Sequence, residues 1–198
     1  MLYKENPQYD AFCSLYEFFP PIKADIVFVG DSITERCQWQ EFLPDKVVLN
    51  RGIGSDICEG VLNRMKTITR HKPQLIFIMI GNNDIGKNVP ISIIISQLKE
   101  IIKIINSELP ETKLYIQIML PVNDHITKTE DILVLNQNYK QLSDNKTVFY
   151  IDLFPLFADG NGLLKNEYDS DGVHITGAGY NAWFNAIFPI CKNYLYIK

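Results

Sequence analysis

The sequence lacks the features that identify several large classes of protein. No apolar run approaches the roughly 18 residues of a membrane-spanning helix, so we expect no membrane insertion. The four cysteines are scattered without a CxxC pair, which argues against a zinc site or a redox motif. There is no basic stripe and the net charge is −4, so nucleic acid is not an expected partner.

The composition favours one globular domain with a large core. Of the 198 residues, 46% are hydrophobic and 12% aromatic, which suffices to fill the core of a single domain. We expect residues 1–198 to form one domain, with residues 1–24 as a helical extension packed on it. Aromatic residues at helical spacing between Phe12 and Phe19 predict that one face of this extension packs on the rest.

The first seven residues lack the basic start and the apolar stretch of a signal peptide. The default expectation is therefore a cytoplasmic protein, and a secreted or periplasmic one if a leader has been removed from the chain. The sequence makes no prediction of the oligomeric state.

Strand-like and helix-like segments alternate along the chain. The expected strands are residues 25–29, 46–50, 74–80, 114–119 and 147–151. The expected helices are a short one from Ser32 to about Phe42 and longer ones over residues 56–69, 90–107, 131–143 and 177–194. Repeated strand–helix–strand units predict an α/β fold, a three-layer α/β/α sandwich with a five-stranded parallel sheet of flavodoxin-like architecture.

A serine stands where a nucleophile could be exposed. Ser32 follows the first predicted strand directly, at the carboxyl end of a buried segment. A serine hydroxyl needs a base to remove its proton, and the base needs a partner that fixes its tautomer. Asp171 and His174, three residues apart, can supply that carboxylate and imidazole, so a hydrolase is the leading hypothesis.

Polar turns follow the next two strands as well. Gly54 and Ser55 follow the second strand, and Asn83 follows the third. In an open parallel sheet these turns share the carboxyl edge, where ligands usually bind. Backbone N–H groups and an asparagine amide are suitable donors to the negative oxygen of a tetrahedral intermediate.

Four segments, taken in order, resemble the conserved blocks of the SGNH hydrolases, also called the GDSL esterase/lipase family. They are GDSIT at residues 30–34, the glycine-rich turn at 52–56, GNND at 81–84 and DGVH at 171–174. The resemblance implies that Ser32 is the nucleophile and first oxyanion donor, Asn83 a side-chain donor, His174 the base and Asp171 its partner. It implies no metal and no organic cofactor.

The second block departs from the usual pattern of the family. Ser55 stands where the family commonly has the oxyanion-hole glycine, and Gly54 precedes it. Either backbone N–H could be the donor. Three further residues are candidate substrate contacts: Asp31, His125 and Tyr168.

The resemblance implies a serine esterase that acts on a small-molecule ester. The expected acyl group is small, with acetyl favoured, and the expected alcohol is a carbohydrate. This sequence is similar to small bacterial carbohydrate O-acetyl esterases and to the catalytic subunits of platelet-activating factor acetylhydrolases. Lysophospholipase, platelet-activating-factor-acetylhydrolase-like and thioesterase activities are alternatives within the family.

Each motif alone also has a structural explanation. Ser32 could cap a helix, Asn83 could be a turn residue, and Asp171 with Gly172 is a common turn dipeptide. A ligand-binding flavodoxin-like module without catalysis is the non-enzyme alternative. The first turn, however, has neither GxGxxG nor a P-loop lysine, and four motifs in the right order favour the hydrolase.

Overall fold

The structure is a computed structural model that describes residues 1–124 and 127–196. Its centre is one all-parallel sheet with the strand order β2-β1-β3-β4-β5. The strands are β1 (Ile26–Gly30), β2 (Val48–Gly52), β3 (Leu75–Met79), β4 (Lys113–Gln117) and β5 (Val148–Ile151). This order is that of flavodoxin-like sheets and confirms the predicted fold class.

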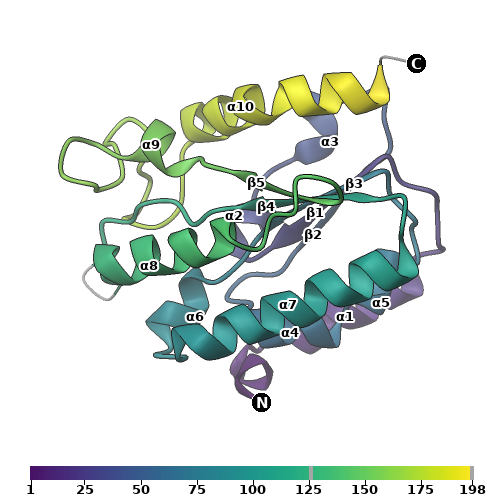
Figure 1. The fold of residues 1–198 in the computed structure, drawn as a ribbon, viewed down its shortest axis with the longest axis horizontal. Helices are drawn as coiled ribbons and strands as arrows, with labels where there is room; N and C mark the ends of the chain where they lie inside the picture. Colours follow the sequence, from purple (N-terminus) through teal and green to yellow (C-terminus); the bar gives the residue numbers. More distant parts are fainter. Residues whose placement is uncertain (125–126, 197–198) are drawn as a thin grey trace.

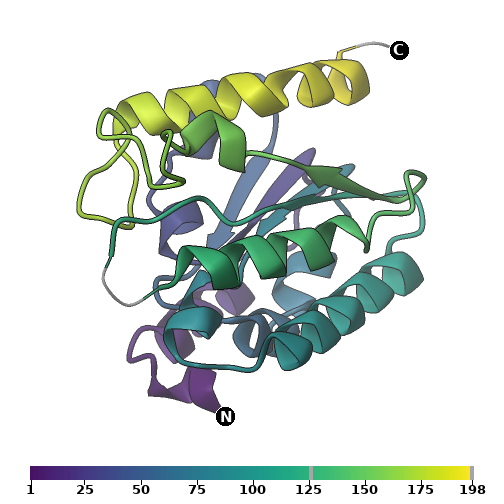
Figure 2. The same cartoon turned by 60° about the vertical axis from the view of Figure 1, so that its left-hand side comes forward.

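Helices cover both faces of the sheet (Figure 1). On one face lie α3 (Trp39–Phe42), α9 (Phe154–Phe157) and α10 (Gly177–Leu195). On the other lie α1 (Tyr9–Phe18), α4 (Cys58–Asn63), α5 (Lys66–Thr69), α7 (Ile91–Glu108) and α8 (Thr129–Lys140), and the turned view in Figure 2 shows the same two layers. The short helices η1 (Leu2–Glu5), α2 (Ser32–Glu35) and α6 (Asn82–Gly86) complete the set. Within the described ranges, no helix has the length and hydropathy that would let it span a bilayer.

Two predicted helices are interrupted in the structure. The segment after Ser32 divides into α2 and α3 because the Asn50 side chain, from β2, donates to the carbonyls of Thr34, Glu35 and Cys37 at 2.9–3.0 Å. These carbonyls would otherwise continue the helix ladder. The predicted helix over 56–69 divides into α4 and α5 where the Thr67 hydroxyl donates to the Arg64 carbonyl at 2.7 Å.

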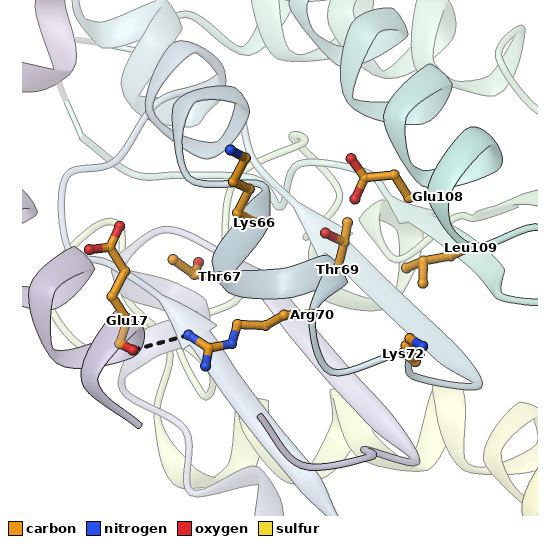
Figure 3. A pocket seen from close by; sticks show the side chains of 8 residues that line it. All are labelled: Glu17, Lys66, Thr67, Thr69, Arg70, Lys72, Glu108 and Leu109. Carbon is orange, nitrogen blue, oxygen red and sulfur yellow. Dashed lines mark hydrogen bonds between the residues drawn. The ribbon is translucent and has the colours of Figure 1, made fainter. Parts of the chain in front are cut away.

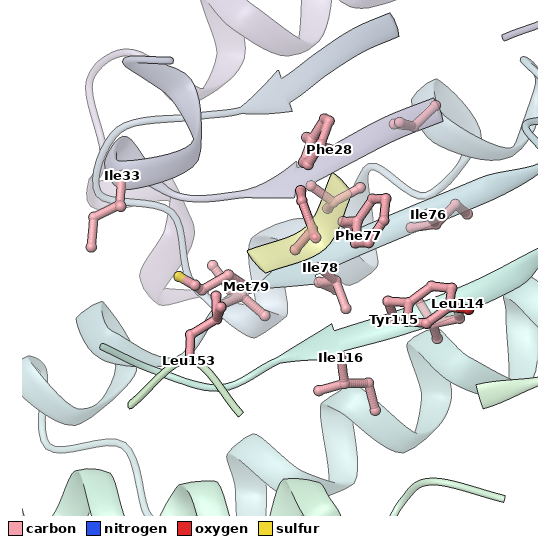
Figure 4. Packing of buried hydrophobic residues seen from close by; sticks show 14 of the residues in the cluster. Phe28, Ile33, Ile76, Phe77, Ile78, Met79, Leu114, Tyr115, Ile116 and Leu153 are labelled. Atoms are coloured by element: carbon pink, nitrogen blue, oxygen red, sulfur yellow. The ribbon is translucent and has the colours of Figure 1, made fainter. Parts of the chain in front are cut away.

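The aromatic side chains of four neighbouring strands form a row on the α10 face, and Figure 4 labels Phe28, Phe77 and Tyr115 among them. The ring centroids of Phe28, Phe77, Tyr115 and Phe149 follow one another at 5.1, 5.2 and 4.9 Å because parallel pairing puts these residues in register. Trp39 stacks on Phe28 at 3.9 Å. Such offset pairs add to the stability that burial of apolar area provides.

The N-terminal segment packs on the domain through a small apolar cluster of its own. Tyr3, Tyr9 and Tyr16 pack there with Ile53 and Ile57, which flank the turn after β2. The predicted packing face is correct only as far as Tyr16. Phe18 is 87% exposed, because α1 ends there and the chain turns away into an extended segment.

A buried ion pair lies beneath the turn after β2. Arg64 Nε donates to Asp56 Oδ2 at 2.9 Å, and both side chains are 1% exposed or less. Arg64 also donates to the carbonyl of Gly30 at the end of β1. The pair therefore ties the end of α4 to the carboxyl ends of β1 and β2.

We expect Arg64→Met to lower the free energy of unfolding by about 3–5 kcal/mol, because it leaves the Asp56 carboxylate buried without its cation. Urea denaturation measures this loss. The control Lys66→Met removes an exposed cation two residues further on, and should change stability by no more than about 0.5 kcal/mol. A loss below about 1 kcal/mol for Arg64→Met would contradict the importance of the pair.

Candidate active site

The turns after three strands meet at the carboxyl edge of the sheet. Ser32 follows β1, Gly54 and Ser55 follow β2, and Asn83 follows β3; the loop before α10 adds His174. Together they line one hollow of about 540 Å³. Its lining residues are Gln8, Ser32, Glu35, Arg36, Gly54, Ser55, Asn83, Asp171, Val173 and His174.

Ser32 and His174 are in hydrogen-bond contact although 142 positions separate them. The distance from Ser32 Oγ to His174 Nε2 is 2.8 Å. On its other side, His174 Nδ1 lies 2.9 and 2.8 Å from the two carboxylate oxygens of Asp171. A carboxylate can only accept, so Nδ1 carries the proton, which leaves the Nε2 lone pair to accept from the serine hydroxyl.

Asp171 is held in its charged form. The backbone N–H of His174 donates to Asp171 Oδ1 at 2.9 Å, and this bond, with the imidazole and the N–H of Val173, lowers the pKa of the carboxyl to about 2. The side chain is 46% exposed, and Arg36 approaches its other oxygen at 3.5 Å. An exposed pair of this kind adds little stability, so the backbone donors fix the carboxylate.

The turn after β2 distinguishes the two candidate backbone donors. The N–H of Gly54 already donates to the Glu35 carboxylate. Ser55 has a φ of +59°, and no hydrogen bond uses its N–H within residues 1–124 and 127–196. Left-handed backbone costs a residue with a side chain about 1–2 kcal/mol, so the surroundings must hold Ser55 in this conformation.

Asn83 lies beside Ser55 at the start of α6, with its amide fixed by one good hydrogen bond. Its Nδ2 donates to the carbonyl of Asp56 at 3.0 Å and reaches Asp31 Oδ2 only at 3.5 Å. One amide hydrogen is thus engaged by the carbonyl, and the half-buried side chain still lines the hollow.

The candidate substrate contacts have different outcomes. Asp31 does not line the hollow: it is 2% exposed, and its carboxylate accepts from the N–H of Ile33 at the start of α2. Tyr168 packs on Phe157 with ring centroids 5.2 Å apart and does not line the hollow. His125 lies outside the described residues.

Sequence reasoning missed four residues that line the hollow: Gln8, Glu35, Arg36 and Val173. Glu35 could have been found, because a residue three positions after Ser32 on a helix lies on the same face. Gln8 carries no such signal, since its position results from the packing of the N-terminal segment on the turn after β2.

A second hollow of about 560 Å³ lies where β3 and β4 begin, and it shares no lining residue with the first (Figure 3). Its cations are Lys66, Arg70 and Lys72, with Glu17 and Glu108 among them. Figure 3 shows the Arg70 guanidinium turned toward the backbone carbonyl of Glu17, to which it donates at 3.0 Å. The threonine hydroxyls of this hollow have no imidazole among its described lining residues, whereas Ser32 in the first hollow contacts His174.

The fold and the site define a class of enzyme, the carboxylic ester hydrolases with an α/β/α architecture. The family model described as "GDSL-like Lipase/Acylhydrolase family" matches residues 28–182. The chain belongs to this family, which confirms the resemblance to the SGNH hydrolases.

Two curated relatives come from mammals. Platelet-activating factor acetylhydrolase IB subunit alpha2 of Rattus norvegicus is 27% identical over 167 residues, covering 79% of this chain and 71% of the relative. The subunit alpha1 of Homo sapiens is 23% identical over 176 residues, covering 85% and 72%.

Solved structures share the fold over nearly the whole chain. A protein from Streptococcus pneumonia, provisionally described as a platelet activating factor, has a TM-score of 0.85 at 29% identity and covers 96% of this chain and 94% of its own. An acetyl-xylooligosaccharide esterase from Geobacillus Stearmophilus has a TM-score of 0.69 at 16% identity, covering 89% and 97%, and this likeness shows the fold alone.

Three aspartates are buried beneath the site. Asp31, Asp56 and Asp84 are each 2% exposed or less. Burial raises the pKa of Asp84 to about 7, and the carboxylates of Asp56 and Asp31 act in the same direction. Both oxygens of Asp84 accept from the N–H of Cys58, which partly opposes this rise.

Stability should therefore depend on pH through Asp84. Its folded pKa lies above the usual value of 3.8, so the folded protein keeps a proton that the unfolded chain loses. The resulting stability is fully present below about pH 4 and is lost as the pH rises through 7.

We expect the free energy of unfolding of Asp84→Asn to increase relative to that of wild type between pH 5 and pH 8, because only wild type loses stability as Asp84 ionises. Urea denaturation at several pH values measures the difference. Asp10→Asn, at an exposed position in α1, is the control and should show no such trend. A constant difference between Asp84→Asn and wild type would mean that Asp84 does not titrate in this range.

Proposed function

We propose that this chain is a serine esterase that removes small acyl groups, acetyl above all, from hydroxylated compounds such as carbohydrates. The observation that carries the proposal is the continuous contact from Ser32 Oγ through the His174 ring to the Asp171 carboxylate, at the edge of a polar hollow. A hydroxyl, an imidazole and a carboxylate in this order form the unit that activates serine in acyl transfer.

In the proposed reaction, Ser32 Oγ forms a bond to the ester carbonyl carbon while its proton passes to His174 Nε2. The tetrahedral intermediate collapses, and the imidazolium returns that proton to the leaving alcohol. Water then loses a proton to His174 and attacks the acyl-serine, which releases the acid and restores the Ser32 hydroxyl. Asp171 stays ionised and stabilises the imidazolium.

Three donors are proposed for the negative oxygen of the intermediate. They are the N–H of Ser32, the N–H of Ser55 and the amide of Asn83. The N–H of Ser32 opens α2, and N–H groups in the first turn of a helix have no partner within it. Ser55 is favoured over Gly54 because Glu35 occupies the Gly54 N–H.

The lining of the hollow favours a polar leaving group. Among the lining residues that the structure describes, Val173 alone has an apolar side chain, while charged or amide groups come from Gln8, Glu35 and Arg36. Hydroxyl groups of a sugar would find hydrogen-bond partners here, whereas a long acyl chain would meet few apolar contacts. The acetyl-xylooligosaccharide esterase has the same fold, and its name indicates acetyl esters of a carbohydrate.

A second candidate is an acetyl ester on a phospholipid-like alcohol. The sequence relatives favour it, because they are named as acetylhydrolases of platelet-activating factor. Both candidates share the acetyl group and differ in the alcohol.

A substrate panel tests the proposal. We expect the highest kcat/KM for acetylated sugars, lower values for an acetylated glycerophospholipid, and a steep fall from acetyl to octanoyl p-nitrophenyl esters. Acyl thioesters and lysophospholipids complete the panel. Preference for the acetylated lipid would select the second candidate, and preference for octanoyl esters or thioesters would contradict both.

Ser32→Ala should lower kcat for the best substrate by about 10,000-fold or more, because the nucleophile is lost. The matched control Ser107→Ala, at an exposed position on α7, should keep wild-type activity and stability. Near-normal turnover in folded Ser32→Ala would remove Ser32 from the mechanism.

Substitutions at Ser55 test the backbone donor. We expect Ser55→Gly to keep kcat within about twofold, because glycine retains the N–H and readily adopts a positive φ. Ser55→Val should lower kcat about 10-fold or more, since a β-branched residue at positive φ is an outlier that displaces the N–H. Equal kcat in these two variants would argue against the Ser55 donor.

A further inference from the structure

The peptide between Gly54 and Ser55 is held by a side chain from the N-terminal segment. Asn6 Nδ2 donates to the carbonyl of Gly54 at 2.6 Å, across 48 positions of sequence. That carbonyl and the N–H of Ser55 belong to one planar trans peptide, so they point in opposite directions. Fixing the carbonyl therefore also fixes the direction of the Ser55 N–H.

Asn6 is itself firmly held. Its side chain is buried, with a residue exposure of 8%, and its Oδ1 accepts from the N–H of Gln8 at 3.1 Å. Its backbone N–H donates to the carbonyl of Tyr3, and its own carbonyl accepts from the N–H of Tyr9. Because Oδ1 is engaged with a donor, the amide cannot flip without losing both of its contacts.

The segment that carries Asn6 is anchored on the same turn. The Tyr16 hydroxyl donates to the carbonyl of Gly52 at 2.7 Å, and the Tyr9 hydroxyl donates to the carbonyl of Gly60 at 2.7 Å. Tyr3 joins these two rings in the apolar cluster with Ile53 and Ile57. These contacts hold the backbone that carries Asn6 in place against β2 and α4.

The turn needs this support because of the residue that it contains. Ser55 has a left-handed backbone, which glycine adopts without cost and serine does not. Glu35 holds the N–H of Gly54 from α2, and Asn6 holds the Gly54 carbonyl from the N-terminal segment. Of the two contacts, the one from Asn6 acts directly on the peptide that bears the Ser55 N–H.

We propose that Asn6 is a positioning residue for the esterase reaction: it orients the Gly54–Ser55 peptide so that the Ser55 N–H faces the developing oxyanion. This inference rests on the proposed function of the site. It gives Asn6 a part in the reaction, while the other residues of the N-terminal segment pack on the domain.

The test compares three variants, two at Asn6 and one at Tyr16. Each removes one hydrogen bond from the N-terminal segment to a backbone carbonyl at the end of β2 or in the turn after it. Asn6→Asp is nearly isosteric, keeps an acceptor for the N–H of Gln8, and turns a carboxylate oxygen toward the Gly54 carbonyl. Tyr16→Phe removes the contact to Gly52, whose carbonyl belongs to a different peptide. Asn6→Ala is the second substitution at Asn6, and it removes the donor without adding charge.

We expect Asn6→Asp and Asn6→Ala to lower kcat about 10- to 100-fold, with KM within about twofold, because a displaced oxyanion donor weakens the transition state more than substrate binding. Tyr16→Phe should keep kcat within about twofold. Rates are expressed per active site titrated with a fluorophosphonate, and thermal melting of all variants shows that they are folded.

The outcomes separate this inference from the proposed function. An active wild type whose kcat is the same in Asn6→Asp, Asn6→Ala and Tyr16→Phe overturns the role of Asn6 alone. A loss confined to melting temperature or to KM does the same. A folded wild type with neither ester turnover nor fluorophosphonate labelling overturns the proposed function, and this inference with it.

Discussion

The contact of 2.8 Å between Ser32 Oγ and His174 Nε2 is the constraint on which the site depends. It requires the loop before α10 to return to the end of β1. That loop is held by Asn123, whose N–H donates to the carbonyl of Gly172 at 2.6 Å, and by the N–H of Ser170, which donates to the carbonyl of His174. Because β1 lies between β2 and β3, the turns of both neighbours flank Ser32.

Much of this arrangement could be predicted from the sequence. The apolar runs gave the five strands, and the parallel order placed the turns containing Ser32, Ser55 and Asn83 at one edge, as the structure has them. The sequence predicts that His174 and Asp171 are neighbours because they are three positions apart, and in the structure they are in contact. Their roles in catalysis remain the proposal made above.

The rest depends on contacts between distant segments, which leave no periodic signal. Asn6 contacts Gly54 only because the N-terminal segment packs on the turn after β2. Asn50 ends α2 by donating to carbonyls about 15 positions away, so the sequence around Ser32 alone predicted too long a helix. The sequence offers Asp31 as a candidate substrate contact, but nothing in it signals that the carboxylate is buried, where it caps the start of α2.

Mass spectrometry of the fluorophosphonate-treated protein measures whether His174 activates Ser32, because the reagent bonds to a serine oxygen that a nearby imidazole activates. We expect one adduct per chain, on the peptide that contains Ser32, and we expect no adduct in a folded His174→Ala variant. An adduct on another residue, or full labelling of Ser32 without the imidazole, would contradict this expectation.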